Sequence, residues 1–375
     1  MIRRKFLKSA ALAGAGSLAA GTAAFPAPAL AQSIPEIKWR MPTSFPKSLD
    51  TIHGGSEMIA NRVAELTDNK FQIRTFAGGE IVPGLQVLDA VQAGTVECGY
   101  SVSYYYVGKD PTFAFDACMP FGLNVRQQSS WQRFGGGLEL TRAFLKDYNV
   151  INFPAGNTGT QMGGWFRKEI KTVDDLNGLK FRIAGIAGQI LTKLGVVPQQ
   201  LAGGDVYPAL EKGTIDAAEW VGPYDDEKLG FNKVAKYYYY PGWWEGGPQV
   251  SLYVNLQQWE SLPKPYKAAI EAATAEANVW MLGKYDAQNP VALRKLIGGG
   301  AQLRPFPRAV MEACLKATNE LYDEIAAQNP KFKKIYEPWK KYRDEQLLWF
   351  RVAEGTFDSF MTAAGQRRAP AKKKG

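Results

Sequence analysis

The sequence predicts an α/β fold of two domains, and three observations support this prediction. Short strand-like segments alternate with helical ones over most of the chain. About 340 residues follow an N-terminal export segment, which is more than one ordinary core accommodates. Residues 87–101 (VLDAVQAGTVECGYS) also align without gaps on residues 206–220 (VYPALEKGTIDAAEW). Each of these segments predicts a helix, a Gly-Thr stop and a strand, so each domain would direct one strand end at a shared cleft. The alternative is a chance match, because helix–turn–strand units recur in any α/β protein.

The N-terminus predicts export across the inner membrane. Residues 3–8 (RRKFLK) form a twin-arginine signal, and an apolar Ala/Gly/Leu stretch follows to about Gly21. Residues 29–31 (ALA) form an A-x-A cleavage site, so 1–31 is the expected signal peptide and the mature chain begins near Gln32. An uncleaved membrane anchor is the alternative, but the apolar stretch is short and rich in Gly and Ala. The mature protein is therefore expected to be soluble and periplasmic.

The expected strands and helices follow from the spacing of apolar residues, which recur at every second residue in a strand and about every 3.6 residues in a helix. They begin with a strand at 37–42, a helix from Gly54 to Leu66 and a strand at 71–76. Further helices are expected at 86–93, 129–146, 187–194 and 206–212, and further strands at 96–102, 150–154, 162–167, 179–183, 215–219 and 249–254. Residues 263–265 (PKP) open a long amphipathic helix to about Gln288, and the chain from there on is mostly helical.

Aromatic residues gather in three short runs, at 104–106 (YYY), 237–240 (YYYY) and 243–244 (WW). Most of these rings are expected in the core or on a sheet surface. A few, Tyr104 among them, are expected to form the apolar wall of a small ligand pocket, in which two or three polar groups set orientation.

The formal charge of +9 comes from the two ends of the chain. Four cations lie within residues 3–8 and five within 365–375, and neither segment contains an acid. The body between them is therefore near neutral, which argues against nucleic-acid binding. Residues 365–375 are expected to form a disordered basic tail.

Cysteine and histidine are too few for most metal and catalytic sites built on them. Cys98, Cys118 and Cys314 cannot all pair within one chain. Cys98 and Cys118 lie in apolar contexts that favour free core residues, although a disulfide between them is the alternative in an oxidising periplasm. The single histidine, His53, is expected to be an exposed or capping residue near a helix start. Most zinc sites and histidine-based triads are excluded.

One arginine stands out within the segment from Asn157 to Trp220. Arg182 lies in a short apolar strand that follows the turn-forming pair 177–178 (NG). An arginine at this position is either a surface residue on the polar face of the strand or a planar clamp for a carboxylate.

Three motifs around this arginine resemble those of the solute-binding proteins of TRAP transporters (tripartite ATP-independent periplasmic transporters). They are residues 175–182 (DLNGLKFR), residues 213–220 (GTIDAAEW), and 78–80 (GGE) with 86–95 (QVLDAVQAGT). The resemblance covers nearly the whole mature chain and is strongest to the branch that binds 2-oxo acids and other small monocarboxylates. It implies a two-lobed periplasmic-binding-protein-like fold with mixed sheets, a cleft between the lobes, a long connecting helix, an extra C-terminal helix and closure by a hinge.

The resemblance also implies the domain boundaries. Lobe I would comprise 32–155 with part of about 242–285, and lobe II 156–241 with part of about 286–330. Residues 331–364 would form a C-terminal helix.

In the family, the arginine that matches Arg182 forms a bidentate salt bridge with the ligand carboxylate. Many members that bind larger acidic ligands have a second arginine near the position of Gln161, so glutamine there indicates a ligand with one carboxylate. The expected ligand-binding residues are Arg182, Gln161, Trp220, Tyr104 and Asn157.

Glu219 poses an electrostatic problem, because it would repel a bound carboxylate unless a cation lies between them. The resemblance implies a metal that bridges protein and ligand. The expected ligands are the side chains of Gln161 and Glu219 and the backbone carbonyl of Trp220, with Glu245 a weaker candidate. Sodium balances one excess negative charge, and calcium becomes the alternative if Glu245 coordinates. The competing interpretation is that Glu219 accepts a hydrogen bond from a tyrosine or a ligand hydroxyl.

The function expected from these features is delivery of a small 2-oxo or 2-hydroxy monocarboxylate, such as pyruvate, to the membrane permease of a TRAP transporter, without enzymatic turnover. A metal-dependent lyase or isomerase that acts on a 2-oxo acid and a sensory binding protein are the alternatives.

The segment from about Glu337 to Ala364 is expected to be one long helix that mediates homodimerisation. Its apolar residues cover more than one face, and a helix of this kind needs to be buried. Packing on its own lobe is the alternative.

Overall fold

A computed structural model describes residues 34–367, and within them the strands form three sheets. Strands β1 (Ile37–Pro42) and β2 (Phe71–Phe76) are parallel and in register from Ile37 opposite Phe71 onward. Helix α1 (Gly54–Leu66) connects them. In the second sheet, β10 (Gln249–Asn255) lies between β3 (Cys98–Ser101) and β4 (Val150–Asn157) and is antiparallel to both. A parallel bridge between Thr43 and Tyr100 joins the end of β1 to β3.

The third sheet is mixed and has the strand order β11-β9-β5-β8-β6-β7. Its strands are β5 (Gly164–Phe166), β6 (Lys180–Arg182), β7 (Val197–Gln199), β8 (Ala217–Ala218), β9 (Tyr237–Tyr240) and β11 (Gln302–Pro305). Strand β5 is antiparallel to β8 and β9, whereas β6 is parallel to β7 and β8. The α/β class with mixed sheets is therefore confirmed.

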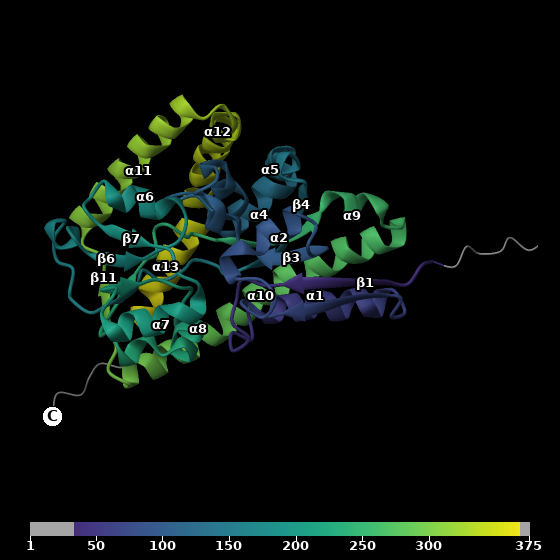
Figure 1. The fold of residues 1–375 in the computed structure, drawn as a ribbon. Helices are drawn as coiled ribbons and strands as arrows, with labels where there is room; N and C mark the ends of the chain where they lie inside the picture. Colours follow the sequence, from purple (N-terminus) through teal and green to yellow (C-terminus); the bar gives the residue numbers. More distant parts are fainter. Residues whose placement is uncertain (1–33, 368–375) are drawn as a thin grey trace, which may run out of the picture. The chain divides into compact units, whose positions relative to one another are not determined.

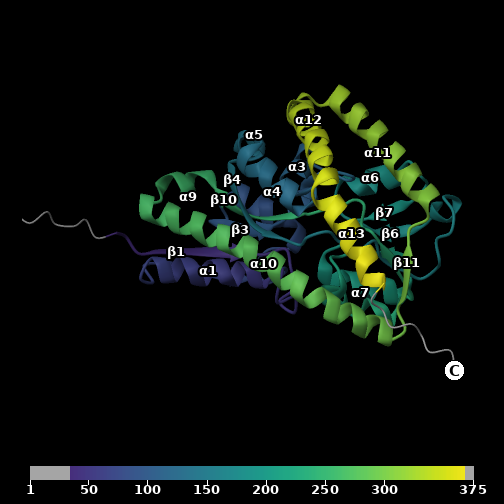
Figure 2. The same ribbon diagram turned by 180° about the vertical axis from the view of Figure 1, so that it is seen from behind.

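Helices account for most of the remaining described chain (Figure 1). They are α2 (Val87–Gln92), α3 (Ala114–Ala117), α4 (Val125–Phe134), α5 (Gly137–Leu145), α6 (Ile186–Thr192), α7 (Gly203–Lys212), α8 (Pro223–Leu229), α9 (Leu256–Ser261), α10 (Lys264–Gly298), α11 (Arg308–Gln328), α12 (Pro330–Val352) and α13 (Glu354–Arg367). Helix α10 packs against α1 and β4 (Figure 2) and also against α8, so it connects the first two sheets with the elements of the six-stranded sheet.

The two similar segments end in different sheets. The first comprises α2 and β3, and the second comprises α7 and β8. Strand β3 belongs to the three-stranded sheet and β8 to the six-stranded sheet. This placement agrees with a fold in which each half of the chain contributes one such unit. The lobe boundaries expected from the sequence stay a prediction.

Three helix predictions were wrong, two because the helix is interrupted and one because it is longer than expected. The single helix expected at 129–146 is two helices, because Gly136 adopts φ +80° between α4 and α5, a conformation that favours glycine. Helix α10 does not stop near Gln288 but continues through Pro290 to Gly298. Proline costs a helix hydrogen bond, but burial of Ala292 and Leu296 beyond it keeps the helix intact.

The C-terminal helix is also interrupted. Helices α12 and α13 are separated by Ala353, whose φ of −84° and ψ of −82° are not helical. Helix α13 runs to Arg367, so residues 365–367 are helical and do not belong to a disordered tail. The rest of the predicted tail and the predicted signal peptide lie outside the described residues.

The cysteines and the histidine are all buried. Cys98, Cys118 and Cys314 are free thiols, in agreement with core roles for the first two. His53 was expected to be exposed or to cap a helix, and exposure was wrong. It does occupy the N-cap position of α1, although its side chain makes no capping hydrogen bond. Its ring is buried before α1, and its Nδ1 lies 3.1 Å from Oγ1 of Thr43. Among the described residues, no helix is both long and apolar enough to cross a membrane.

Candidate ligand and cation site

Arg182 and Glu219 lie at the carboxyl ends of two paired strands. Strands β6 and β8 are parallel, with Arg182 opposite Ala218. Glu219 follows directly, and its backbone N–H donates to the Arg182 carbonyl at 3.1 Å. Because the carboxyl ends of parallel strands share one edge of a sheet, this register places both side chains at the edge where α/β sheets bind ligands.

Arg182 is a buried cation, since its side chain is only 2% exposed. The expectation of a surface residue is thereby excluded. Its Nη1 donates to the backbone carbonyl of Glu219 at 2.8 Å and forms a salt bridge with Oε1 of the Glu219 side chain. Its Nε and Nη2 both donate to the backbone carbonyl of Leu201, at 3.2 and 3.1 Å. Burial alone would lower the pKa of Arg182, but the negative charge of Glu219 reverses this effect and raises it.

Glu219 has a second partner besides the arginine. Its Oε1 also accepts a hydrogen bond from the backbone N–H of Ala184 at 3.1 Å. Burial raises the pKa of Glu219, while Arg182 and this N–H oppose the increase.

Glu245 and Gln161 place two unpaired oxygens in the same region. Both side chains are buried, and within the described chain Oε2 of Glu245 and Oε1 of Gln161 have no hydrogen-bond partner. The backbone N–H of Gln161 donates to the Glu245 carbonyl at 3.0 Å, so the two loops are adjacent. Burial raises the pKa of Glu245 well above its usual range, the negative charge of Glu219 raises it further, and Tyr104 and Arg182 oppose both effects.

Two aromatic residues enclose the charged groups. The guanidinium carbon of Arg182 lies 4.9 Å from the centre of the Trp220 ring, a cation–π contact. Tyr104, in the 3₁₀ helix Ser103–Tyr106, is buried against Gly185, where an added Cβ would lie 3.1 Å from the Tyr104 Cβ. The structure therefore brings Tyr104, Arg182, Glu219, Trp220 and Glu245 together. Gln161 lies on the loop that is bonded to the Glu245 carbonyl.

Asn157 has a different role in this structure. Its Nδ2 donates to the Gly247 carbonyl at 3.0 Å, and its Oδ1 accepts from the backbone N–H of Gly159 at 2.9 Å. Both polar groups are thus occupied by the loops that carry Gln161 and Glu245. Asn157 positions these loops, and its expected contact with the ligand stays a prediction.

The donor set fits a hard cation. Carboxylate, amide and backbone oxygens are the ligands that hard cations such as calcium prefer. Buried oxygens without partners are rare, and the site has two, on Gln161 and Glu245. In the part of the chain that the structure describes, no group of three or more His, Cys, Asp or Glu side chains could hold a metal. A cation here would accordingly depend on the amide and backbone oxygens as well as on the carboxylates.

Residues 43–329 match the sequence model of the bacterial extracellular solute-binding proteins, family 7. The chain belongs to this family. A monocarboxylate 2-oxoacid-binding periplasmic protein of Nostoc sp. is 51% identical over 97% of this chain and the whole of that protein. The resemblance to TRAP solute-binding proteins is therefore confirmed.

Two solved structures of TRAP solute-binding proteins are similar to this one. The protein from Bordetella bronchiseptica is 56% identical, with a TM-score of 0.88 over 89% of this chain and 100% of that one. It is a mixed-occupancy dimer with copurified calcium and picolinate in the occupied site. The protein from Pseudoalteromonas atlantica is 37% identical, with a TM-score of 0.84 over 86% of this chain and 99% of that one, and binds sodium and pyruvate.

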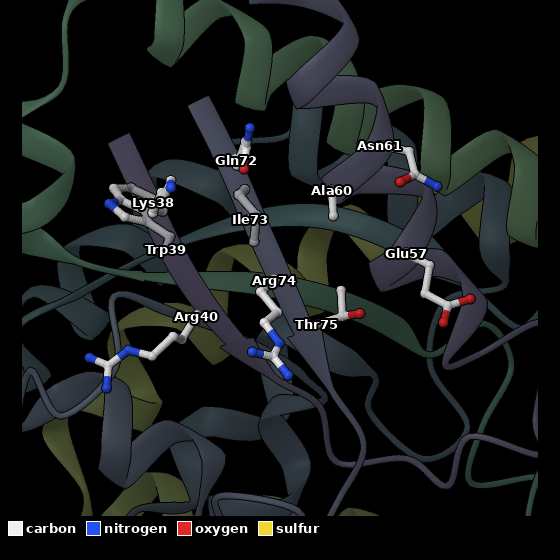
Figure 3. A pocket seen from close by; sticks show the side chains of 10 residues that line it. All are labelled: Lys38, Trp39, Arg40, Glu57, Ala60, Asn61, Gln72, Ile73, Arg74 and Thr75. Atoms are coloured by element: carbon white, nitrogen blue, oxygen red, sulfur yellow. The ribbon is translucent and has the colours of Figure 1, made fainter. Parts of the chain in front are cut away.

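Two hollows on this solute-binding protein differ in their relation to the Arg182 region. One of about 760 Å³ lies on β1, β2 and α1 (Figure 3). Its polar side chains include Lys38, Arg40 and Arg74, all exposed. A second hollow, of about 490 Å³, lies between residues 78–86 and 200–205, and its lining includes Leu201. It therefore borders Leu201, the residue whose carbonyl Arg182 binds.

Sequence reasoning missed two parts of the site, the backbone carbonyl of Leu201 and the side chain of Gln200. Leu201 contributes only its carbonyl, and Gln200 next to it donates from Nε2 to the Tyr105 carbonyl at 2.8 Å. A backbone carbonyl leaves no signal in residue type. Gln200 lies in the sequence just after strand β7, which was not expected either.

Proposed function

We propose that this protein is the periplasmic solute-binding protein of a TRAP transporter and that it carries a small 2-oxo or 2-hydroxy monocarboxylate to the membrane permease. The observation that carries the proposal is the buried Arg182, stacked on Trp220, beside the unpaired oxygens of Gln161 and Glu245. The relatives support the ligand class, since one binds 2-oxoacids and the two solved structures contain picolinate and pyruvate.

In this proposal Arg182 binds the ligand carboxylate, while Tyr104 and Trp220 form apolar walls. A single arginine suits a ligand with one carboxylate. A diacid would need a second cationic side chain, and Gln161 occupies the position where such an arginine would be expected. The side chains of Gln161 and Glu219 and the backbone carbonyl of Trp220 hold a cation that bridges to ligand oxygens. Sodium is the first candidate, and calcium is the alternative if Glu245 also coordinates. Asn157 contributes through the loop geometry described above.

The location and assembly are part of the same proposal. Twin-arginine export of residues 32–375 to the periplasm agrees with the family's extracellular role. Homodimerisation agrees with the dimeric Bordetella relative. It also agrees with the strongly exposed apolar side chains at the end of α12 and on α13, which are Leu348, Trp349, Val352, Phe357 and Phe360.

Calorimetry on metal-stripped mature protein tests the proposal. Pyruvate should bind weakly in chelator-treated, sodium-free buffer and regain affinity when sodium or calcium is added. Succinate, a diacid of similar width, serves as the matched control and should bind poorly under both conditions. NMR of the same samples should show pyruvate unchanged after prolonged incubation. Turnover of pyruvate would favour an enzyme, and absence of binding with any cation would overturn the proposed ligand class.

A further inference from the structure

The guanidinium of Arg182 has one edge left for a ligand, and Glu219 already uses half of it. A bidentate carboxylate needs two parallel N–H groups from one edge of the fork. The Nε–Nη2 edge is directed at the Leu201 carbonyl. The remaining edge joins Nη1 and Nη2, and Nη1 is bonded to the carbonyl and the carboxylate of Glu219.

A ligand carboxylate at this edge and the Glu219 carboxylate at Nη1 therefore compete for the same donor. Two carboxylates on one buried guanidinium also repel each other strongly, because the site is removed from water. The Ala184 N–H gives Glu219 an anchor that does not depend on Arg182. The negative charge of Glu219 acts on Glu245, and Gln161 lies on the loop bonded to the Glu245 carbonyl. The unpaired oxygens of Glu245 and Gln161 therefore offer a cation further ligands near Glu219.

We propose that Glu219 acts as an internal competitor of the ligand, and that it releases Nη1 of Arg182 when it coordinates the bridging cation. The inference rests on the proposed function and adds a mechanism to it. Without the cation, Glu219 blocks the ligand edge of Arg182. With the cation, Glu219 turns from competitor to metal ligand, so cation and ligand bind with positive coupling. Linkage requires the ligand to strengthen cation binding by the same factor.

The decisive variant is Glu219→Gln, because a pure metal ligand and an internal competitor predict opposite results without the cation. In wild type, the cation should raise pyruvate affinity by about 5- to 150-fold, the usual range for coupled sites. In cation-free buffer, Glu219→Gln should bind pyruvate several-fold more tightly than wild type, since an unpaired buried arginine favours an incoming carboxylate. With the cation, it should bind more weakly than wild type. Unchanged or weaker cation-free binding in Glu219→Gln would overturn the proposal.

A second measurement needs no organic ligand and covers the case in which Glu219→Gln does not fold. In Arg182→Ala, Glu219 has lost its arginine partner and should bind calcium or sodium alone more tightly than in wild type. The cation should therefore raise the thermal midpoint of Arg182→Ala more than that of wild type. An equal or smaller shift would contradict the competition.

Glu312→Gln is the matched control, because it removes a glutamate from an exposed pair with Arg308. It should behave as wild type in both assays. If wild type binds no pyruvate with any cation, the proposed function fails, while the cation-only assay still decides whether Arg182 and the cation compete for the Glu219 carboxylate.

Discussion

Two nitrogens of Arg182 donate hydrogen bonds to the backbone carbonyl of Leu201, Nε at 3.2 Å and Nη2 at 3.1 Å. This contact fixes the rotation of the guanidinium plane before any ligand arrives. Gln200 ties the same loop to the Tyr105 carbonyl at 2.8 Å. The orientation of the proposed carboxylate anchor thus depends on a loop whose conformation is set by hydrogen bonds to backbone.

Arg182→Lys should weaken pyruvate binding by about tenfold or more, because an ammonium cannot hold Leu201 and a bidentate carboxylate together. Arg182→Ala should abolish measurable binding. Calorimetry at saturating cation checks both, with circular dichroism to verify the fold. Affinity close to wild type in the alanine variant would show that Arg182 is not the anchor.

Glu245→Gln should raise thermal stability and at the same time weaken cation binding. The carboxyl group is buried and raised in pKa by burial and by Glu219. Deprotonation of Glu245 is therefore more favourable in the unfolded state, so the free energy of unfolding falls as pH rises. Glutamine has no such ionisation, and the variant does not lose this stability. In metal-stripped samples at pH 8, the variant should unfold at a higher temperature than wild type. It should also bind calcium more weakly, as measured by calorimetry. Unaltered affinity for both sodium and calcium would exclude Glu245 from the metal shell.

Asp226 should make stability depend on pH. Burial raises its pKa to about 7, although Tyr238 and Trp165 donate hydrogen bonds to its Oδ2 at 2.6 and 3.0 Å. A carboxyl group with a raised pKa in the folded state contributes stability that is complete below its unfolded pKa and is lost as pH rises through the folded value. The contribution of Asp226 should therefore fall between about pH 4 and pH 7.

Asp226→Asn is the variant that measures this contribution, because its amide oxygen keeps both donors. The thermal midpoint of wild type should decrease from pH 5 to pH 8, and that of the variant should decrease less. Neighbouring Asp225, whose pKa burial raises to about 6, should cause part of the remaining slope. Parallel pH profiles for wild type and variant would contradict the assignment.

Deletion of residues 354–375 should convert a dimer into a monomer. The first half of α12 is covered by its own chain, since Trp339 is buried and packs on Phe115 and Tyr322. On α13, by contrast, Phe357 and Phe360 are 63% and 70% exposed. Exposed apolar side chains grouped on one helix favour association with another protein surface.

Light scattering after size-exclusion chromatography checks the mass of wild type and truncated protein at micromolar concentration. Phe360→Glu is the milder variant and should shift the equilibrium towards monomer, whereas Glu312→Gln should not. A monomeric wild type would refute the dimer.

The spacing of apolar residues in the sequence predicted those strands and helices in which buried residues recur regularly. The bounds of β1, α1 and β2 agree with the sequence prediction because apolar residues recur there at spacing 2 or at helical spacing. The pattern failed at β9, where four consecutive tyrosines carry no alternation although Tyr238 and Tyr239 are buried. It failed also at β7 and β11, which are three or four residues long and are strands only because neighbours pair with them.

The sequence by itself determined the family, the α/β class, and the presence of one arginine and one glutamate in two specific motifs. Residue type and local spacing contain this information. Only the tertiary structure decided that Arg182 bonds to Glu219, 37 residues further along the chain, and to the Leu201 carbonyl. The physical reason is that strand register and loop packing set distances between segments. These distances, together with removal of the site from water, decide which charges compete.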